Sequence, residues 1–486
     1  MAPPAFGLPV FDALRLAGVA LDVQAAPRLG AAAIRQRQDE RLRALLAAAR
    51  LRSRLWRELL PASLPGRDGA IDLRALPIVH KAQLMRRFDD WIGDPEIELP
   101  ALRRFMAEPA NIGSAFLGRY IVWESSGTSG LPGIFVQDAQ AMAVNDALEG
   151  VRRAVAQPWR RTFDPLYLSE RMAFVGATGG HFASVVSIER LRRLNPWMRA
   201  AFHSLSILQP TRALVAELNA LAPTILASYP TGIALLAEQA RAGALRVRPS
   251  EIWTGGETLS AAVREFAEQA FGCRVRDSYG ASEFLSIASE CNHGRLHANA
   301  DWVILEPVDE HARPVPPGVA SHTTLLTNLA NHVQPLIRYD LGDSLRIVPE
   351  PCACGSPLPV IEVQGRHDDT LRLRDARGHC ATWLPLALST LLEEDAGVCD
   401  FQLLQRDART LALRVGASGA EGRRALARCS EALRALAARD GLPGLRLVEE
   451  PDLPLVHGSS GKVQRVIAAT PPSPRARRAP PPPPGR

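Results

Sequence analysis

Apolar and polar residues follow different spacings in successive parts of the chain, and each spacing predicts a kind of structure. The first 100 residues or so are rich in Ala, Leu and Arg, and apolar positions recur at helical spacing from Ala32 to Leu60. From about Tyr120, short apolar runs alternate with amphipathic stretches. We therefore predict a helical first region, followed by strands that alternate with helices.

This alternation predicts an α/β domain with a largely parallel sheet, because helices that connect buried strands are typical of parallel pairing. The predicted strands are Tyr120–Trp123, Met172–Val175, Thr224–Ala227, Glu251–Trp253 and Val275–Ser278. The predicted helices between them are Thr211–Leu221, Gly232–Ala242 and Ala261–Phe271.

The pattern changes again after Gly365, where shorter elements predict a small α+β lobe. Its predicted strands are Leu371–Arg374, Asp400–Gln405, Leu411–Val415 and Leu445–Glu449, and its predicted helices are Leu384–Glu393 and Glu421–Ala438. The end of the chain is rich in proline and has no apolar core material, which is typical of disorder. We divide the chain into a helical region of the large domain (1–100), an α/β core (101–365), a small lobe (366–470) and a tail (471–486).

Charge and composition exclude several classes of protein. The net charge is +6, but Arg is interspersed with Asp and Glu, and aromatic residues make up only 6%. We therefore expect no nucleic-acid binding. No uncharged apolar run of about 18 residues is present, so we expect no membrane span. Seven cysteines without a secretion signal fit a reducing cytoplasm.

A Ser/Gly-rich segment directly follows the first predicted strand. It reads Glu124-Ser125-Ser126-Gly127-Thr128-Ser129-Gly130-Leu131-Pro132-Gly133. Glycines let backbone amides approach a polyphosphate, and hydroxyls donate hydrogen bonds to its oxygens. A solvated turn is the alternative, and the segment lacks the Gly-Lys-Ser/Thr ending of a Walker loop.

This segment resembles the phosphate loop of the adenylate-forming superfamily, which binds AMP, and further motifs occur in the order of that family. In many members a lysine follows the proline, where this chain has Gly133, as is common in the phenylacetate-CoA ligase branch. The resemblance implies that the phosphate loop holds ATP through Ser125, Ser126, Gly127, Thr128, Ser129 and Gly130. It also implies a large domain with mixed or parallel sheets and a small mobile C-terminal lobe.

Two later motifs resemble the family's nucleotide-binding turns. Gly255-Gly256-Glu257 resembles the turn that contacts adenine. Tyr279-Gly280-Ala281-Ser282-Glu283 resembles the motif whose tyrosine stacks on adenine, whose serine binds phosphate and whose glutamate holds magnesium. A hard cation that bridges ATP oxygens needs such a carboxylate. The resemblance therefore assigns Mg²⁺ to Glu283.

Two motifs further on resemble the family's ribose and hinge segments. Arg338-Tyr339-Asp340-Leu341-Gly342-Asp343 implies that Asp343 accepts both ribose hydroxyls, because a carboxylate can accept two hydrogen bonds, while Asp340 is structural. Gly365-Arg366-His367-Asp368-Asp369 implies Arg366 near the ribose or phosphate and Asp368 as the hinge.

Only two of the 57 basic residues are lysines, Lys81 and Lys462. A lysine retained among so many arginines indicates a task that a planar guanidinium cannot perform, although chance survival is the alternative. Lys462 lies in a Gly-Lys-x-x-Arg pattern that resembles the mobile lobe of the family, where the lysine bridges the substrate carboxylate and the α-phosphate. Lys81 is assigned no chemistry.

Weaker patterns point to the substrate pocket. Phe174 to Phe182 ends a predicted strand in a glycine-rich turn, and His181 within it is a candidate gate at the carboxylate pocket, with helix capping as the alternative. This run also resembles a branch related to synthetases that adenylylate a deazaflavin coenzyme. Tyr229 and Trp253 are further candidate neighbours of the acid.

Cysteine and histidine spacing predicts a metal site. Cys291 with His297 and Cys352 with Cys354 lie in loop-like sequence, and three thiolates with one imidazole make a closed, structural zinc site. His293 competes with His297, and free loop thiols are the alternative. The remaining four cysteines, Cys273, Cys380, Cys399 and Cys429, are predicted to be core residues.

Taken together, the motifs imply an ATP-dependent, AMP-forming ligase that activates an aryl or acyl carboxylic acid and transfers it to a thiol. Coenzyme A is the expected acceptor, and a carrier-protein thiol or another coenzyme is the alternative. A non-catalytic nucleotide-binding protein is a second alternative. The identity of the acid is not encoded in any motif, and the oligomeric state is left open, with a homodimer as one option.

Overall fold

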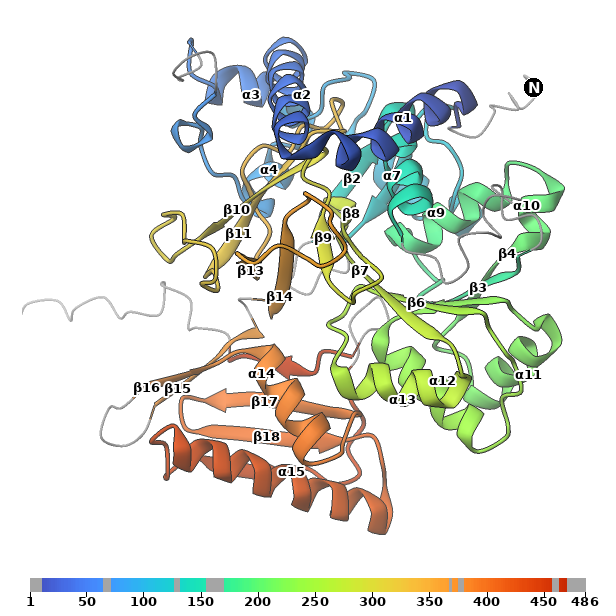
Figure 1. The fold of residues 1–486 in the computed structure, drawn as a ribbon, viewed down its shortest axis with the longest axis vertical. Coiled ribbons are helices and arrows are strands. Elements are labelled where there is room, and N and C mark those ends of the chain that lie inside the picture. Colours follow the sequence, from blue (N-terminus) through green and yellow to red (C-terminus); the bar gives the residue numbers. More distant parts are fainter. Residues whose placement is uncertain are drawn as a thin grey trace, which may run out of the picture. The chain divides into compact units, whose positions relative to one another are not determined.

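The chain folds into two compact units in the computed structural model, which describes residues 11–63, 71–125, 132–153, 170–366, 369–374, 380–456 and 463–469 (Figure 1). The first unit spans Met1–His367 with Val456–Val463, and the second spans Asp368–Leu455 with Gln464–Arg486. Each unit has its own hydrophobic core. The units are therefore described separately.

The first region is helical, as predicted. Its helices are α1 (Ala13–Ala25), α2 (Gly30–Arg52), α3 (Arg54–Leu59), α4 (Lys81–Arg86), α5 (Phe88–Trp91) and α6 (Leu99–Met106), with short 3₁₀ turns at Ala26–Leu29, Leu73–Ala75 and Pro109–Asn111. Asp12 and Ser53 cap α1 and α3 by accepting hydrogen bonds from backbone amides. The indoles of Trp56 and Trp91 both donate to the carbonyl of Pro335, so these helices are tied to a distant loop.

A nine-stranded mixed sheet forms the centre of the first unit. Its strand order is β13-β14-β9-β8-β7-β6-β5-β3-β4, and pairing is parallel from β4 through β7 and antiparallel from β7 to β13. The strands are β3 (Met172–Gly176), β4 (Phe202–Ser206), β5 (Ile225–Ser228), β6 (Glu251–Gly255), β7 (Arg274–Ala281), β8 (Phe284–Glu290), β9 (Leu296–Ala298), β13 (Asp343–Val348) and β14 (Val360–Arg366). The prediction of a largely parallel sheet therefore holds for one half only.

Helices connect the parallel strands. They are α9 (Ala183–Arg192), α10 (Pro196–Ala201), α11 (Thr211–Leu221), α12 (Pro230–Arg241) and α13 (Ala261–Phe271). The predicted bounds of α11 and α13 are confirmed. Ser260 caps α13 by accepting from the amide of Val263, and Gly272 ends it at a positive φ of 68°. Apolar faces of α11, α12 and α13 pack with the strands in one core cluster.

Two small sheets complete the first unit. Strand β1 (Ile121–Glu124) pairs antiparallel with β2 (Ile134–Gln137), which is followed by α7 (Ala139–Arg152). The prediction that the segment Tyr120–Trp123 belongs to the parallel sheet is therefore wrong. The other small sheet contains β10 (Val303–Val308), β11 (Thr323–Asn328) and β12 (Tyr339–Asp340).

The second unit is α+β, as predicted. Strands β15 (Leu371–Arg374) and β16 (Cys380–Trp383) form a hairpin, and β19 (Arg446–Glu449), β18 (Thr410–Val415), β17 (Phe401–Asp407) and β20 (Val466–Ile467) form a four-stranded sheet in that order. The helices are α14 (Pro385–Thr390), a π-helical turn (Leu391–Asp395) and α15 (Gly419–Arg439).

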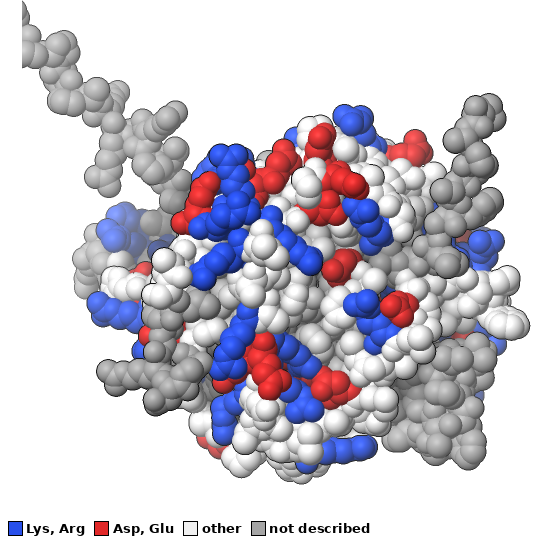
Figure 2. Space-filling view, turned by 90° about the horizontal axis from the view of Figure 1, so that it is seen from above, with Lys and Arg blue, Asp and Glu red and all other residues white. Residues whose placement is uncertain are grey.

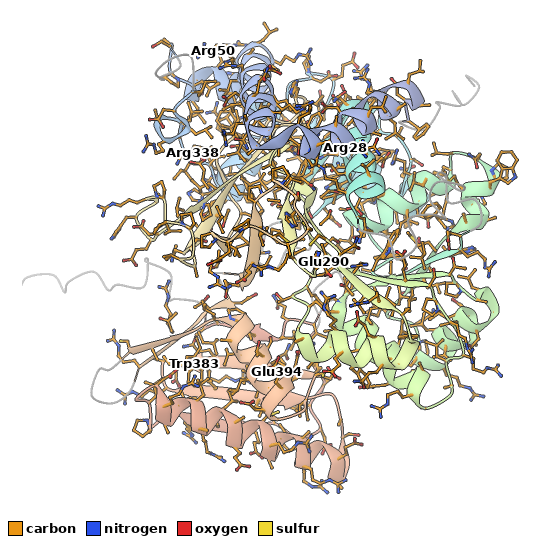
Figure 3. The ribbon with its side chains drawn as sticks, viewed as in Figure 1. Arg28, Arg50, Glu290, Arg338, Trp383 and Glu394 are labelled. Atoms are coloured by element: carbon orange, nitrogen blue, oxygen red, sulfur yellow. The ribbon has the colours of Figure 1, made fainter. Side chains whose placement is uncertain are left out.

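Buried polar contacts fix the second unit. Trp383 (Figure 3) donates its indole N–H to Asp440 at 2.8 Å. Arg465, the arginine of the Gly-Lys-x-x-Arg pattern, pairs with buried Glu393 and donates to the carbonyl of Cys399. Arg465 therefore anchors β20 within this unit.

The predicted core cysteines differ from one another. Cys429 is fully buried in α15, Cys273 and Cys399 are half-buried, and Cys380 is exposed. The prediction for Cys380 is therefore wrong, because it lies on β16 of a two-stranded hairpin that leaves one face open.

Acidic and basic side chains are interspersed on the face of the molecule shown in Figure 2. This mixture fits the alternation of Arg with Asp and Glu along the chain. No helix in the described part of the chain is long and apolar enough to cross a membrane.

Candidate nucleotide-binding site

Most of the predicted nucleotide-binding residues lie at the ends of neighbouring strands. Gly255 is the last residue of β6 and pairs with Ser278 of β7, and Gly256 follows with a positive φ of 79°. Ligands of open α/β sheets bind outside the carboxyl ends of the parallel strands. The fold therefore brings the predicted adenine turn and the Tyr279–Glu283 motif to the edge of the sheet where a ligand is expected.

The Tyr279–Glu283 motif makes the sharp turn from β7 into β8. A Cβ on Gly280 would lie 1.8 Å from the carbonyl oxygen of Leu285, so only glycine fits there. Ser282 and Glu283 form the tip between β7 and β8, because Ala281 pairs with Phe284. The indole of Trp123, in β1, donates to the carbonyl of Ser282 at 2.8 Å. The strand before the phosphate loop is thus tied to this turn.

Asp343 lies in a polar group with Tyr279 and Arg366. The Tyr279 hydroxyl donates to Asp343 Oδ2 at 2.5 Å, and Arg366 Nε lies 3.9 Å from Asp343 Oδ1. Asp343 and Arg366 face each other as cross-strand partners of β13 and β14. Burial, followed by the Asp343 charge, raises the pKa of Tyr279, so its hydroxyl keeps its proton. The predicted ribose aspartate and the predicted Arg366 are therefore brought together.

Glu283 is buried, and its carboxylate Oε1 accepts a hydrogen bond from the Tyr339 hydroxyl at 2.7 Å. Burial raises the pKa of Glu283, because the charged form has lost solvent. A nearby cation would favour the charged form, so the residues present fit a magnesium ligand. The sequence motif Arg338–Asp343 contains Tyr339 but implies no role for it. Its position between Arg338 and Asp340 is the one sequence feature that could have indicated this contact.

Asp340 is held by the protein itself. Its carboxylate accepts from Thr323 Oγ1 and from the amide of Gly342, and it lies 3.2 Å from His80 Nδ1. The preceding Arg338 (Figure 3) is buried, has a positive φ of 48° and donates to the carbonyl of Leu76. These contacts agree with a structural role for Asp340 and fix the backbone that leads to Asp343.

The two ends of the phosphate-loop segment are joined by a pair of hydrogen bonds. The amide of Ser125 donates to the carbonyl of Gly133, and the amide of Gly133 donates to Ser125 Oγ at 2.8 Å. The predicted residues Ser126, Gly127, Thr128, Ser129 and Gly130 lie outside the described residues, as do Asp368 and Lys462.

Lys81 was assigned no chemistry, but its side chain lies beside this loop. A Cβ placed on Gly133 would be 3.4 Å from Lys81 Cδ. Gly133 is the position where many family members carry a lysine, so the stem of Lys81 passes where that side chain would start. The rarity of lysine in the chain was the one signal that could have singled it out.

His181 is buried close to the start of the phosphate loop. Its carbonyl accepts from the amide of Glu124, and its ring lies 6.0 Å from the ring of Phe105. Burial lowers the pKa of His181, and among the described residues its Nε2 has no hydrogen-bond partner. A neutral imidazole with a free polar atom can bind a substrate group, and the role of His181 at the carboxylate pocket stays a prediction.

Glu257, Tyr229 and Trp253 have partners within the protein. Glu257 Oε2 accepts from the amide and the hydroxyl of Thr231, so it caps the start of α12. Tyr229 is buried with its ring edge-to-face against Phe174 at 6.2 Å. Trp253 donates to Glu251 at 2.9 Å and lies under the guanidinium of Arg153. Glu257 therefore holds the Gly255–Glu257 turn to α12.

Asp277, two residues before Tyr279, makes the free energy of unfolding depend on pH. Burial raises the pKa of Asp277 to about 7, although Thr254 Oγ1 donates to it. Unfolded Asp277 loses its proton near pH 4, so between about pH 4 and 7 the folded chain binds more protons, and the free energy of unfolding falls as the pH rises. We expect Asp277→Asn to be more stable than wild type at pH 8 by on the order of 3 kcal/mol, with a smaller difference at pH 5. Urea midpoints at both pH values would measure this, and parallel pH profiles of the two proteins would contradict it.

The predicted zinc ligands are also assembled. Cys291, His297, Cys352 and Cys354 come together at the opposite ends of β8 and β14 from Glu283 and Arg366. Their geometry is described below.

A mixed nine-stranded sheet with the predicted nucleotide motifs at its strand ends, together with a separate α+β unit, is the architecture that the family resemblance implies. Residues 198–321 match the family model described as AMP-binding enzyme, which includes the Gly255–Glu257 and Tyr279–Glu283 motifs. This part of the chain is therefore similar to AMP-binding enzymes.

Solved structures with a similar fold are acid–CoA ligases. A 2-hydroxyisobutyryl-CoA ligase in the postadenylation state, in complex with 2-HIB-AMP, is 21% identical with a TM-score of 0.62, covering 90% of this chain and 89% of that chain. The same ligase in complex with 2-HIB-AMP and CoA, in the thioesterification state, is 20% identical with a TM-score of 0.55, covering 91% of each chain. At these identities the similarity establishes the fold.

A curated relative matches part of the sequence. Protein CapK from Staphylococcus aureus is 27% identical over 193 residues, which are 37% of this chain and 39% of CapK. The match thus spans about two fifths of the length of that relative.

Proposed function

We propose that the protein is an ATP-dependent, AMP-forming ligase that activates a carboxylic acid as an acyl adenylate and transfers the acyl group to coenzyme A. The single observation that carries this proposal is the polar group at the strand ends, in which the Asp343 carboxylate lies between the Tyr279 hydroxyl and Arg366. A carboxylate held beside a cation and an aromatic ring suits a ribose next to a stacked base. The match of residues 198–321 to the AMP-binding enzyme model supports the same assignment.

Each of these residues would have a separate role in adenylation. Asp343 would accept the ribose hydroxyls, Tyr279 and the Gly255-Gly256 turn would hold adenine, and Arg366 and the phosphate loop would bind phosphate oxygens. Magnesium, when bound with ATP, would neutralise phosphate charge, and Glu283 would hold it. The carboxylate oxygen of the acid attacks the α-phosphorus, and pyrophosphate leaves. Because the enzyme forms no covalent bond in this step, positioning and charge stabilisation carry the catalysis.

In the second step, the thiol attacks the acyl carbon of the adenylate, and AMP leaves with the bonding electron pair. Coenzyme A is the preferred acceptor, because the ligase of similar fold is described in complex with an acyl adenylate and CoA. The phenylacetate-CoA ligase branch stays a prediction. A carrier-protein thiol or another coenzyme is the alternative acceptor.

Exchange of labelled pyrophosphate into ATP tests this function. We expect exchange that depends on one class of acid from a panel of aryl, alkyl and hydroxy acids, and release of AMP with thioester when coenzyme A is added. Adenylate that accumulates without thioester would favour another acceptor. Absence of exchange with every acid, despite ATP binding, would refute the ligase and favour a nucleotide-binding protein.

Lys81 gives a prediction specific to this chain. The proximity of its stem to Gly133 supports a role for its ammonium at the ATP phosphates. Hydrogen bonds to charged groups contribute about 1.5–3 kcal/mol, so Lys81→Met should raise KM for ATP by roughly 10- to 100-fold. Steady-state kinetics would measure this. Lys81→Arg is the matched control, because it keeps the charge and should lose less, and an unchanged KM in Lys81→Met would contradict the role.

A further inference from the structure

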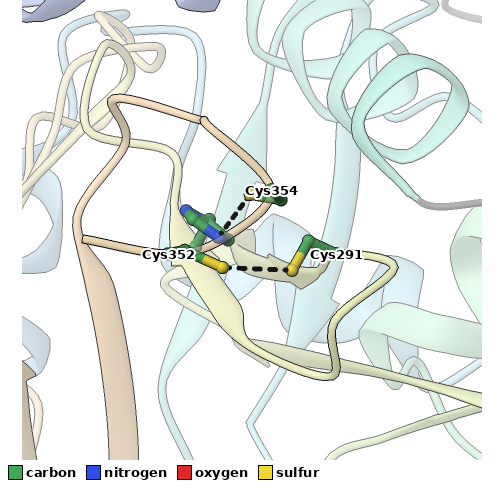
Figure 4. Close-up of side chains that lie close together, drawn as sticks. Cys291, Cys352 and Cys354 are labelled. Atoms are coloured by element: carbon green, nitrogen blue, oxygen red, sulfur yellow. Dashed lines mark hydrogen bonds between the residues drawn. The ribbon is translucent and has the colours of Figure 1, made fainter. Parts of the chain in front are cut away.

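Four potential metal ligands converge in the first unit from the β8–β9 turn, from β9 and from the loop before β14, away from the predicted nucleotide residues. We call them the Cys₃His cluster: Cys291, His297, Cys352 and Cys354. Their ligand atoms all lie within 4.8 Å of one another. Cys291 Sγ lies 3.8 Å from Cys352 Sγ, and Cys354 Sγ lies 3.3 Å from His297 Nε2 (Figure 4).

The Cys291–Cys352 and Cys354–His297 separations are close to those around one tetrahedral ion. With Zn–S bonds of about 2.3 Å and Zn–N bonds of about 2.0 Å, neighbouring ligands of a tetrahedral zinc lie roughly 3.8 Å apart for two sulfurs and roughly 3.5 Å for sulfur and nitrogen. The Cys291–Cys352 separation of 3.8 Å agrees with the first value and is far too long for a disulfide bond of about 2.05 Å.

The backbone makes the same kind of turn at Cys291 and at Cys352. Cys291 and Cys352 each accept, at their carbonyls, a hydrogen bond from a glycine amide three residues later, and both glycines, Gly294 and Gly355, have positive φ. A backbone amide also points at a sulfur in each loop, from His293 to Cys291 Sγ and from Ser356 to Cys354 Sγ, both at 3.4 Å. Amide donors of this kind stabilise thiolates.

The histidine ligand is oriented by a second contact. His297 is buried, and its Nδ1 lies 2.8 Å from the carbonyl oxygen of Leu358. Because a carbonyl can only accept, Nδ1 carries the proton and Nε2 keeps its lone pair directed at the cluster. His297, rather than His293, is therefore the histidine of the cluster.

The cluster joins parts of the sheet that pair weakly. Strand β14 meets β9 through only two residue pairs, Val360 with His297 and Ile361 with Leu296. The β13–β14 pair carries Asp343 and Arg366, whereas β8 follows directly on Glu283. A bond between the β8–β9 turn and the loop before β14 would fix these strands relative to one another.

We propose that the Cys₃His cluster binds one structural zinc ion, which clips the β13–β14 pair to the β8–β9 turn. Four protein ligands leave no open position, so the ion is structural and takes no part in the acyl transfer. The site stands independently of the proposed function, because it rests on the ligand geometry alone.

Metal analysis of the purified full chain tests the proposal. We expect about one zinc per chain under reducing conditions, and cobalt substitution should give the thiolate charge-transfer and ligand-field bands of a tetrahedral sulfur-rich site. Wild-type protein with neither zinc nor the cobalt bands, or with a Cys291–Cys352 disulfide, would overturn it. Metal content is read without substrate, so failure of the ligase assay leaves this result unaffected.

Matched variants separate ligands from packing residues. Cys354→Ser and His297→Gln should lose zinc and melt at a lower temperature, whereas His297→Cys should keep zinc because it supplies a fourth thiolate. Cys380→Ser, in the second unit, is the control and should keep about one zinc per chain. If the ligand variants fail to fold, chelation of the wild-type protein should lower its melting temperature, and readdition of zinc should restore it. Stoichiometric zinc in Cys354→Ser would refute the assignment.

Discussion

Lys462→Arg should reduce acid-dependent pyrophosphate exchange by on the order of 100- to 1,000-fold, the loss that follows when one preorganised donor no longer reaches its place in a transition state. The side chain keeps its positive charge in this variant, so the loss would come from shape. A lysine ammonium is a compact point charge, whereas guanidinium is a planar fork that cannot take the same position between a carboxylate and the α-phosphate. The chain uses Arg at 55 of its 57 basic positions, so this substitution changes only the feature in question.

Thioester formation, the second half-reaction, serves as the control for Lys462→Arg. If the lobe withdraws Lys462 before the thiol enters, thioester formation from a supplied acyl adenylate and coenzyme A should stay near the wild-type rate. An unchanged melting temperature would show that the fold is intact. Near-normal pyrophosphate exchange in the variant would mean that Lys462 survived among the arginines by chance.

Asp343→Ala should raise KM for ATP by roughly 100- to 10,000-fold, because two hydrogen bonds to a charged acceptor, each worth about 1.5–3 kcal/mol, are lost. The variant would also leave the Tyr279 hydroxyl without its acceptor and remove the negative charge beside Arg366. A more specific measurement than KM is the preference for ATP over nucleotides that lack one ribose hydroxyl. Wild type should prefer ATP strongly over its 2′- and 3′-deoxy forms, whereas Asp343→Ala should treat the three alike.

Asp340→Ala is the matched control for Asp343→Ala. Its carboxylate is held by Thr323, Gly342 and His80, so its removal should lower stability while preference for ATP over the deoxy forms is kept. Kinetics with the three nucleotides would compare the variants directly. If Asp343→Ala still rejected the deoxy nucleotides, the ribose would have to be bound elsewhere.

Local patterns predicted much of the first unit and the second unit. The bounds of α11 and α13 follow from amphipathic spacing that ends at Gly272 in the second case, and β15 was predicted with its observed bounds. The individual antiparallel strands of the main sheet were not predicted, although the family resemblance implied mixed sheets. Strand β9 has three residues, and β14 pairs with it across about sixty residues of chain, so neither leaves a periodic signal of its own.

In the candidate site, too, local motifs were predicted and contacts between distant segments were not. Motifs predicted Asp343, Glu283 and Tyr279 as site residues, because each lies in a short motif of the required residue types. Tyr339 and Lys81 were missed as site neighbours, since a tyrosine hydroxyl on Glu283 and a lysine stem beside Gly133 depend on how distant segments meet. Only the tertiary structure shows that Glu257, which is predicted at the nucleotide, also accepts from Thr231 at the start of α12.

The amino-acid sequence by itself determined the alternation of strands and helices, the order of the nucleotide motifs and the spacing of the cysteines, because each depends on residues that are neighbours along the chain. The tertiary structure alone decided that β1 leaves the main sheet, that Asp343 faces Arg366, and that His297 rather than His293 joins the three cysteines. Each of these outcomes depends on the register between strands that are distant in sequence. Register is selected by burial and hydrogen bonding over the whole sheet, which no short stretch of sequence contains.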